Sequence, residues 1–291
     1  SEQVVERAAP TQAKSSSLRT DWFLRLSWFL VALSIPLCFT LLQIDWSQLW
    51  APRTQKLLGE VFTSGVPSIP TGSELQDLVR LSGLTLAMSV VAIALAGLGG
   101  VLLSFPAAQN FLMPGGLLRP LGERGQGWPI LAWVALFLSR IALLVSRAVP
   151  APIWALVFLF VLFPGILPGA LALAAHNFGI LGRLMAEVNE NLDDRPIRAL
   201  RGLGANGGQV ILYGILPQNL PRFLAYTLYR WEVCMREAVI VGLVGAGGLG
   251  RLLTEQISSF DYPRLTITLA AFVVLTFVVD LVSSQLRSAL R

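Results

Sequence analysis

The chain alternates long apolar runs with shorter polar connections. Six runs are long enough to cross about 30 Å of hydrocarbon at about 1.5 Å per helical residue. They are Trp22–Ile44, Leu81–Phe105, Trp128–Val149, Ile153–Ala175, Phe223–Gly245 and Leu265–Leu286. Lipid offers the backbone no hydrogen-bond partners, so a span must be a helix or part of a closed barrel. The short alternating segments of a barrel are missing from the sequence, and all six runs are therefore predicted to be helices. The pattern therefore predicts an all-α integral membrane protein.

Composition supports this class. Of the 291 residues, 54% are hydrophobic and only 13% are charged, against about 25% charged in an ordinary soluble domain. The net charge of +5 is spread between the apolar runs, so no nucleic-acid partner is expected. Cys38 and Cys234 both lie in apolar runs, which predicts neither a disulfide framework nor a metal site.

The distribution of Lys and Arg predicts the topology. With the N-terminus inside, the inner segments hold about twice as many basic residues as the outer ones, so both termini are predicted to be cytoplasmic. Residues 1–21 then form a cytoplasmic tail, and 22–80 a first transmembrane helix with an extracytoplasmic loop. A short amphipathic helix is expected around Gln55 to Phe62. Residues 81–291 form the transmembrane core, which contains a cytoplasmic loop at 177–221.

The most polar part of that loop lies between residues 193 and 221. Two aspartates precede Pro196, which is typical of a helix start. Ile197, Leu200 and Leu203 then recur every third residue beside arginines, as on a short amphipathic helix. Glycines between residues 202 and 208 end it, and Gln209–Ile215 suits a second short helix. A short helix held between glycines and prolines at a membrane face is typical of a docking element.

The spacing in this loop resembles the EAA loop of ABC importer permeases, with the pattern Glu-Ala-Ala, three residues, Gly, nine residues, Ile-x-Leu-Pro. Ala199, Gly204, Leu216 and Pro217 match this pattern, whereas Arg198, Leu200 and Gly214 depart from it, Arg198 by reversing a charge. In that family the loop docks on the ATP-hydrolysing subunit. The resemblance implies an ATPase-coupling role for Asp194, Arg198, Ala199, Leu200, Arg201, Gly204, Ala205, Leu216 and Pro217.

The third apolar run carries two arginines on one helical face. Arg140 and Arg147 are seven residues apart, which is about two turns. Arg140 is predicted near mid-membrane, where a charge needs an acidic partner or an aqueous path. Arg147 is near the outer end and can reach the interface. Structural pairing and substrate contact both remain open for Arg140.

The fifth apolar run carries four charges, at Arg230, Glu232, Arg236 and Glu237. Glu232 and Arg236 are four apart and are predicted to pair along one face, while Arg230 and Glu237 share another. Such groups usually face a bundle interior or an aqueous path. Pairing between helices and contact with a passing anion both remain open. Asp280 in the last run is a candidate partner for a membrane arginine.

Three further segments have a distinctive local composition. Residues 106–127 hold glycines and prolines and are predicted to form an irregular inner loop. The fourth apolar run contains Pro164-Gly165 and Pro168-Gly169, which predict a kink or break near its middle. His176 is placed at the cytoplasmic end of that helix, in a capping or packing role. The glycine-rich residues 242–250 follow the fifth run and suit a constriction or a moving joint.

The second half of the chain resembles permeases of the phosphonate type. Arg147, Pro150, Trp154 and Ala155 resemble their Arg-x-x-Pro-x-x-x-Trp-Ala segment, and residues 242–250 resemble their GAGGLG-type segment. The interpretation of these features gives a translocation path of Arg140, Arg147, Trp154, Arg230, Glu232, Arg236 and Glu237, and a gate of Gly245, Gly247 and Gly248.

The resemblance implies a type I, methionine-importer-like bundle of about six transmembrane helices in a bacterial inner membrane. Its function would be that of the permease subunit of an ATP-driven importer for a phosphorus oxyanion such as a phosphonate or phosphite. Expected partners are two cytoplasmic ATPase subunits, a second permease copy, a periplasmic substrate-binding protein and the lipid bilayer. No catalytic constellation is present, so ATP and Mg²⁺ are expected only in the partner ATPase. Import of methionine or another oxyanion, and an ion-coupled secondary carrier, are the alternatives.

Overall fold

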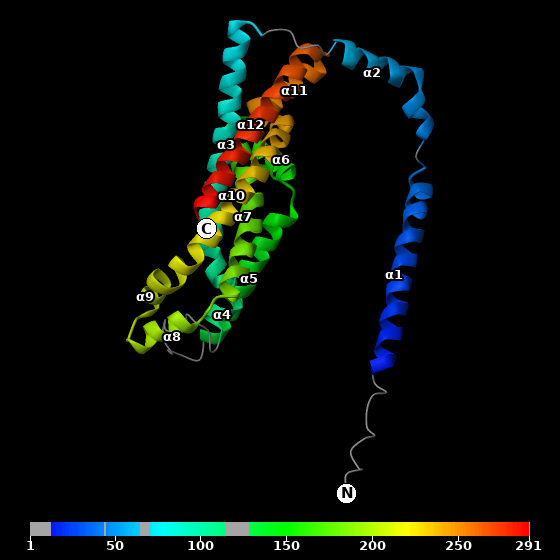
Figure 1. The fold of residues 1–291 in the computed structure, drawn as a ribbon. Helices are drawn as coiled ribbons and strands as arrows, with labels where there is room; N and C mark the ends of the chain where they lie inside the picture. The colour runs from blue at the N-terminus through cyan, green and yellow to red at the C-terminus, as the bar shows by residue number, and fades with distance from the viewer. Residues whose placement is uncertain (1–12, 44, 65–69, 114–127, 291) are drawn as a thin grey trace. The chain divides into compact units, whose positions relative to one another are not determined.

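The computed structural model describes residues 13–43, 45–64, 70–113 and 128–290 (Figure 1). Regular structure within these ranges is entirely helical, which agrees with the predicted class. The contacts divide the chain into two units, residues 1–62 and 63–291, and each is described by itself.

The first unit contains a long apolar helix and a short amphipathic one. Helix α1 (Ala13–Leu42) is 30 residues long, and from Trp22 onward it is apolar apart from Arg25 and a few hydroxyl residues, as suits a span surrounded by lipid. It begins before the predicted start at Trp22, and residues 1–12 of the predicted tail lie outside the described residues. After the 3₁₀ turn η1 (Trp46–Trp50) comes α2 (Pro52–Ser64), which contains the amphipathic helix predicted at 55–62.

The second unit begins with α3 (Gly72–Ala107), a helix of 36 residues. It starts well before the predicted Leu81, because Thr71 and Glu74 form a capping box that starts the helix within the polar segment. At about 1.5 Å per residue it is roughly 54 Å long, so part of it extends beyond the hydrocarbon. Helix α4 (Gln109–Leu112) follows, and the rest of the predicted inner loop, 114–127, lies outside the described residues.

The predicted fourth span is two helices rather than one. After α5 (Trp128–Ala148), α6 (Ala151–Val161) ends before Pro164, and α7 (Ile166–Glu190) begins after it. The predicted break is therefore confirmed, since the residue before a proline disfavours helical geometry. The predicted end at Ala175 is wrong, because α7 continues for four more turns with apolar residues facing the core. His176 consequently lies inside α7 and not at its end.

Helix α7 packs against α3 and α5 in the middle of this unit (Figure 1). Small residues allow the close approach: a Cβ added to Gly100 would lie 3.1 Å from the backbone nitrogen of Gly182. A Cβ added to Gly179 would lie 2.6 Å from the carbonyl oxygen of Leu143. Close helix packing through glycine is how membrane helices gain van der Waals contact in the absence of a hydrophobic driving force.

The remaining elements complete the second unit around α3, α5 and α7. Helix α8 (Arg195–Gly202), α9 (Gly207–Gln209) and the π-helical η3 (Val210–Ile215) lead into α10 (Leu216–Val241). A second π-helical turn, η4 (Gly242–Ala246), α11 (Gly248–Ser258) and α12 (Tyr262–Ala289) complete the bundle.

The described residues do not reproduce a count of six spans. They contain 4 helices long and apolar enough to cross a membrane, or up to 5 if the bent pair made by residues 207–246 and 248–258 counts as one. Helix α6, with 11 residues, is too short to cross. Helix α7 is 25 residues long but carries polar residues through its second half.

Candidate functional site: the two ends of helix α10

Helix α8 has one buried face and one exposed face. It begins at Arg195 with Pro196 in its first turn, as predicted. Ile197 is fully buried in a small core with Phe111, Val210 and Ile215. The opposite face carries exposed Arg198 and Ala199. The predicted apolar face is confirmed for Ile197 and for Leu200, which packs against the same core, but it is wrong for Leu203, which is 86% exposed. On the exposed face, Arg198 pairs with Asp194 at 3.0 Å.

The end of α8 is a Schellman turn, which holds it in a fixed orientation. Gly204 adopts a φ of 84°, its N–H donates to the carbonyl of Arg201 at 2.9 Å, and the N–H of Ala205 donates to Leu200 at 3.1 Å. A Cβ at Gly204 would meet nothing within 4 Å. Glycine is therefore required here for its backbone conformation and not for space. Leu203, the last residue before this turn, is 86% exposed.

Arg140 lies at this end of the bundle, beside the ends of α3 and α7, and its predicted depth in the membrane stays a prediction. Its Nη2 is 2.6 Å from Oε1 of Glu190, in the last turn of α7. Its Nε donates to the carbonyl of Ala107 at 3.0 Å, where α3 ends. Carbonyls at a helix end have no intrahelical donor, so a guanidinium is a suitable partner. Structural pairing is the role that these contacts support.

Two buried asparagines join the helices beneath the loop, and sequence reasoning missed them. Asn219 of α10 donates to Asn189 of α7 at 2.8 Å. Asn189 in turn donates to Ser104 of α3 at 3.0 Å. All three residues are fully buried. Asn189 and Asn219 stand among polar residues and prolines in the sequence, so nothing local marks them, although asparagine is a residue type that forms hydrogen bonds between membrane helices.

Midway along α10, Arg230 belongs to a partly buried polar cluster. Its guanidinium donates to Oδ1 of Asn177 at 2.6 and 2.9 Å and to Oε1 of Glu237 at 3.1 Å. Asn177 also donates to the other carboxylate oxygen of Glu237 at 3.1 Å. The shared face predicted for Arg230 and Glu237 is confirmed. The third member of the cluster, Asn177, lies on α7. Sequence spacing along α10 could not reveal it, because only packing brings α7 and α10 together.

The predicted pair of Glu232 and Arg236 is wrong. The Glu232 carboxylate is nearly buried and pairs with Arg287 in the last turn of α12. Within the described ranges, the hydrogen bond that Arg236 donates goes to the backbone carbonyl of Glu232 at 3.3 Å. Its Nη2 lies 3.9 Å from Asp280, the candidate partner named from sequence. A buried carboxylate needs a close cation, and α12 supplies one that sequence spacing along α10 cannot reveal.

Arg147 and Trp154 lie on either side of the α5–α6 turn. The indole N–H of Trp154 donates to the carbonyl of Ser146 at 3.1 Å, and its ring stacks on Phe158. Arg147 is exposed and has no ion pair within the described residues. His176 is 2.9 Å from the carbonyl of Val149, which links α7 to the same turn.

The far end of α10 is a glycine break. Gly245, Gly247 and Gly248 have φ angles of 111°, 98° and 68°, and the helices on the two sides are bent by 59°. A Cβ added to Gly242 would lie 2.8 Å from Cα of Gly250. The N–H of Leu249 donates to the hydroxyl of Thr85 on α3 at 2.9 Å. The glycines thus permit both the bend and the close backbone approach, and the constriction or moving joint expected here stays a prediction.

Comparison with known proteins identifies the family. Residues 100–291 match the binding-protein-dependent transport system inner membrane component. The chain belongs to this family. As a member it is a multi-pass membrane permease and a transport subunit, and the family implies an ABC transporter with an ATPase and a substrate-binding protein.

Relatives and solved structures agree with this assignment. The chain is 34% identical over 203 residues to the phosphite transport system permease protein PtxC of Stutzerimonas stutzeri, covering 70% of this chain and 67% of the relative. It is 33% identical over 217 residues to the phosphate-import permease protein PhnE of Mycolicibacterium smegmatis, covering 74% of this chain and 37% of the relative. An inward-facing MetNI methionine ABC transporter superposes with a TM-score of 0.61 at 17% identity, covering 76% of this chain and 100% of that one. The methionine-importer-type fold is thereby shown.

Proposed function

We propose that the chain is the permease subunit of an ATP-driven importer for a phosphorus oxyanion, such as a phosphonate or phosphite. Relatives named as phosphite and phosphate permeases support this substrate class. The oxyanion would pass from a periplasmic binding protein through the bundle to the cytoplasm. The chain would sit in the bacterial inner membrane with both termini in the cytoplasm, as the basic residues indicate.

The observation that carries the coupling part of this proposal is the two-faced α8. Ile197 anchors the helix in a core shared with η3, which continues directly into α10. The exposed Arg198 and Ala199 face away from that core. A short helix held in this way transmits a push on its exposed face to α10, because packed interiors do not absorb small displacements. We assign this face to a groove on the ATPase.

The proposed mechanism is alternating access in a dimer. Two ATPase subunits, each holding ATP and Mg²⁺, close and bring the coupling helices of two permease copies together. The permease contributes no catalytic group to hydrolysis. Helix α10 then tilts and the glycine break at Gly245–Gly248 opens the path toward the binding protein. Arg147, the exposed cation at the α5–α6 turn, is a suitable first contact for an oxyanion.

Purification from the native membrane in mild detergent tests this proposal. An ATPase should copurify with the permease at equal copy number, and the complex should contain two copies of each. The complex in liposomes, supplied with the binding protein, should take up phosphite or a phosphonate only with ATP. Uptake of methionine in place of these oxyanions would show that the proposed substrate class is wrong. Transport without ATP or an ATPase would overturn the importer and favour a secondary carrier.

A further inference from the structure

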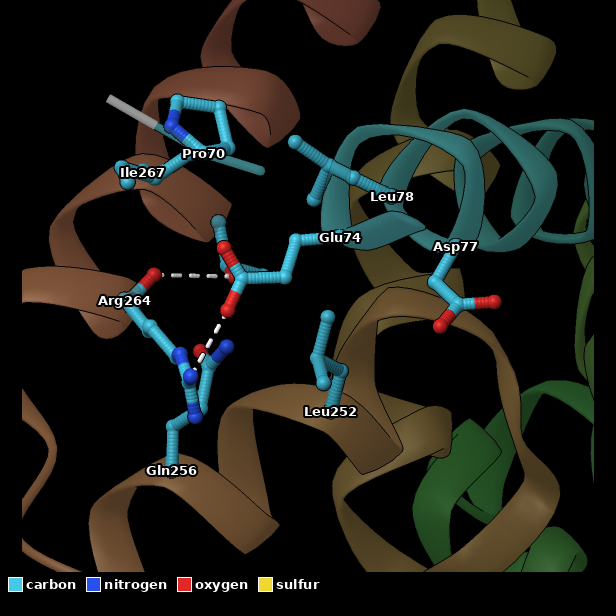
Figure 2. A pocket seen from close by; sticks show the side chains of 9 residues that line it. Pro70, Glu74, Asp77, Leu78, Leu252, Gln256, Arg264 and Ile267 are labelled. Atoms are coloured by element: carbon cyan, nitrogen blue, oxygen red, sulfur yellow. Dashed lines mark hydrogen bonds and ion pairs between the residues drawn. The ribbon is translucent and has the colours of Figure 1, made fainter. Parts of the chain in front are cut away.

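A small cavity lies between the first turns of α3, α11 and the first turns of α12 (Figure 2). Its volume is about 210 Å³, and Pro70, Leu78, Leu252 and Ile267 form its apolar walls. Pockets for drug-sized ligands start at roughly 300 Å³. The cavity is therefore better suited to a single side chain than to a separate small molecule.

One side of the cavity holds an ion pair that is already complete. Arg264 lies 2.6 Å from a carboxylate oxygen of Glu74 and 3.3 Å from one of Asp261. Figure 2 shows this pair to one side of the cavity and the Asp77 carboxylate to the other. Asp77 has no ion pair in the described part of the chain. The net charge left for an incoming group is thus negative.

A buried acceptor without a partner points to a ligand as well. Gln256 of α11 lines the cavity and is only 8% exposed, and its Oε1 has no hydrogen-bond donor among the described residues. Buried polar oxygens nearly always have a donor, since leaving one unpaired is costly. Asp77 offers acceptors only, and Gln256 offers its unpaired Oε1 next to the donors of its amide NH2 group, beside apolar walls.

We infer that this cavity receives one lysine or arginine side chain of the substrate-binding partner. This rests on the proposed function, in which that protein meets the end of the bundle opposite α8. The aliphatic stem of a basic side chain suits the apolar walls, and its charged head suits Asp77 and Gln256. Because the attraction is electrostatic, added salt should slow docking.

The position of the cavity would connect docking to the glycine break. Gln256 lies on α11, which begins at Gly248, directly after the break. Asp77 lies on α3, which also carries Thr85, the hydrogen-bond partner of Leu249 at the start of α11. A side chain held by both Asp77 and Gln256 would fix the orientation of α11 relative to α3. Docking would then bias the break between its open and closed arrangements.

The test uses the complete permease–ATPase complex in lipid nanodiscs and its purified binding protein. Asp77→Asn removes the charge and keeps the shape, and Gln256→Leu removes the unpaired oxygen. Each substitution should weaken the affinity of the complex for the binding protein about tenfold. ATP hydrolysis stimulated by the binding protein should fall, and basal hydrolysis without the binding protein should be unchanged. The matched control is Glu255→Gln, next to Gln256 but exposed and paired with Arg251; it should change the affinity less than about twofold.

Gln256→Leu also separates a binding role from a folding role. Removing a buried unpaired acceptor should leave the melting temperature of the complex unchanged or raise it, while the affinity falls. A variant that loses affinity only together with melting temperature would overturn the inference. Asp77→Asn then serves as the independent measurement, because Asp77 is exposed and its substitution does not disturb the core.

A photo-cross-linking residue at Leu252 identifies the occupant. The expected product joins it to a segment of the binding protein that contains a lysine or arginine. Replacing that lysine or arginine of the binding protein with glutamine should not lower its affinity for the Asp77→Asn complex any further. This is the result that a double-mutant cycle gives for two residues in direct contact. Additive losses, or a cross-link to α2 of the permease itself, would overturn the inference.

The two proposals fail differently. A complex that imports no oxyanion and binds no binding protein contradicts the proposed function. A complex that imports and docks normally, but with unchanged affinity in Asp77→Asn and Gln256→Leu, contradicts only the assignment of this cavity.

Discussion

The two ends of α10 are built on different principles. At the end that follows the loop, Asn219, Asn189 and Ser104 form a buried chain of hydrogen bonds, and Ile197 anchors α8 in its own core. At the other end, Gly242 and Gly250 bring backbone against backbone, with three glycines at positive φ. Specific side-chain contacts hold one arrangement, whereas glycines permit several. The first end is suited to transmit a displacement and the second to change shape.

The largest effect is expected at the turn that ends α8. Gly204→Val should lower ATP-driven uptake more than about tenfold, because a β-branched residue strongly disfavours a positive φ and the coupling helix would reorient. Membrane insertion should be intact. Gly204→Asn is the matched control, since asparagine tolerates this conformation. Uptake in proteoliposomes measures both, and normal uptake by the valine variant would remove this turn from coupling.

The opposite end should respond to added volume instead. Gly250→Ala places a methyl group against the carbonyl of Val239 and Cα of Gly242. Overpacking of this kind costs about 1–3 kcal/mol, which thermal unfolding in detergent would register as a lower melting temperature. Gly202→Ala, where a Cβ meets nothing within 4 Å, is the control and should be neutral. Equal stability of the two variants would mean that backbone contact does not define the glycine break.

The asparagine chain should show coupling between its members. Asn219→Leu leaves the buried Asn189 oxygen without its donor and should cost about 1–2 kcal/mol. Replacing both asparagines with leucine should cost less than the sum of the single changes. Unfolding of the single and double variants provides the cycle, and simple additivity would contradict a shared network.

The smallest effect on stability is expected at Arg236. Its guanidinium is 53% exposed and 3.9 Å from Asp280, and pairs this open contribute less than about 1 kcal/mol. Arg236→Gln should therefore leave the fold intact and the ATPase attached. It should lower the rate of transport if Arg236 lies on the translocation path. Uptake rates at several substrate concentrations measure this. Unchanged kinetics would exclude Arg236 from the path.

Local patterns predicted the elements well where the signal was itself local. The conformational limits of proline and glycine explain the start of α8 beside Pro196 and the break at Pro164-Gly165, and the hydrophobic period explains the buried Ile197. The start of α3 was missed because its capping box lies in a polar segment that resembles a loop.

The sequence by itself determined the class, the apolar runs and the loop that carries the family pattern. Only the tertiary structure decided the partners of the charges: Glu190 for Arg140, Asn177 for Arg230, and Arg287 for Glu232. Each of these pairs joins two helices that are far apart in the chain. Helical spacing specifies which residues share a face of one helix, but the neighbour of that face depends on how the helices pack.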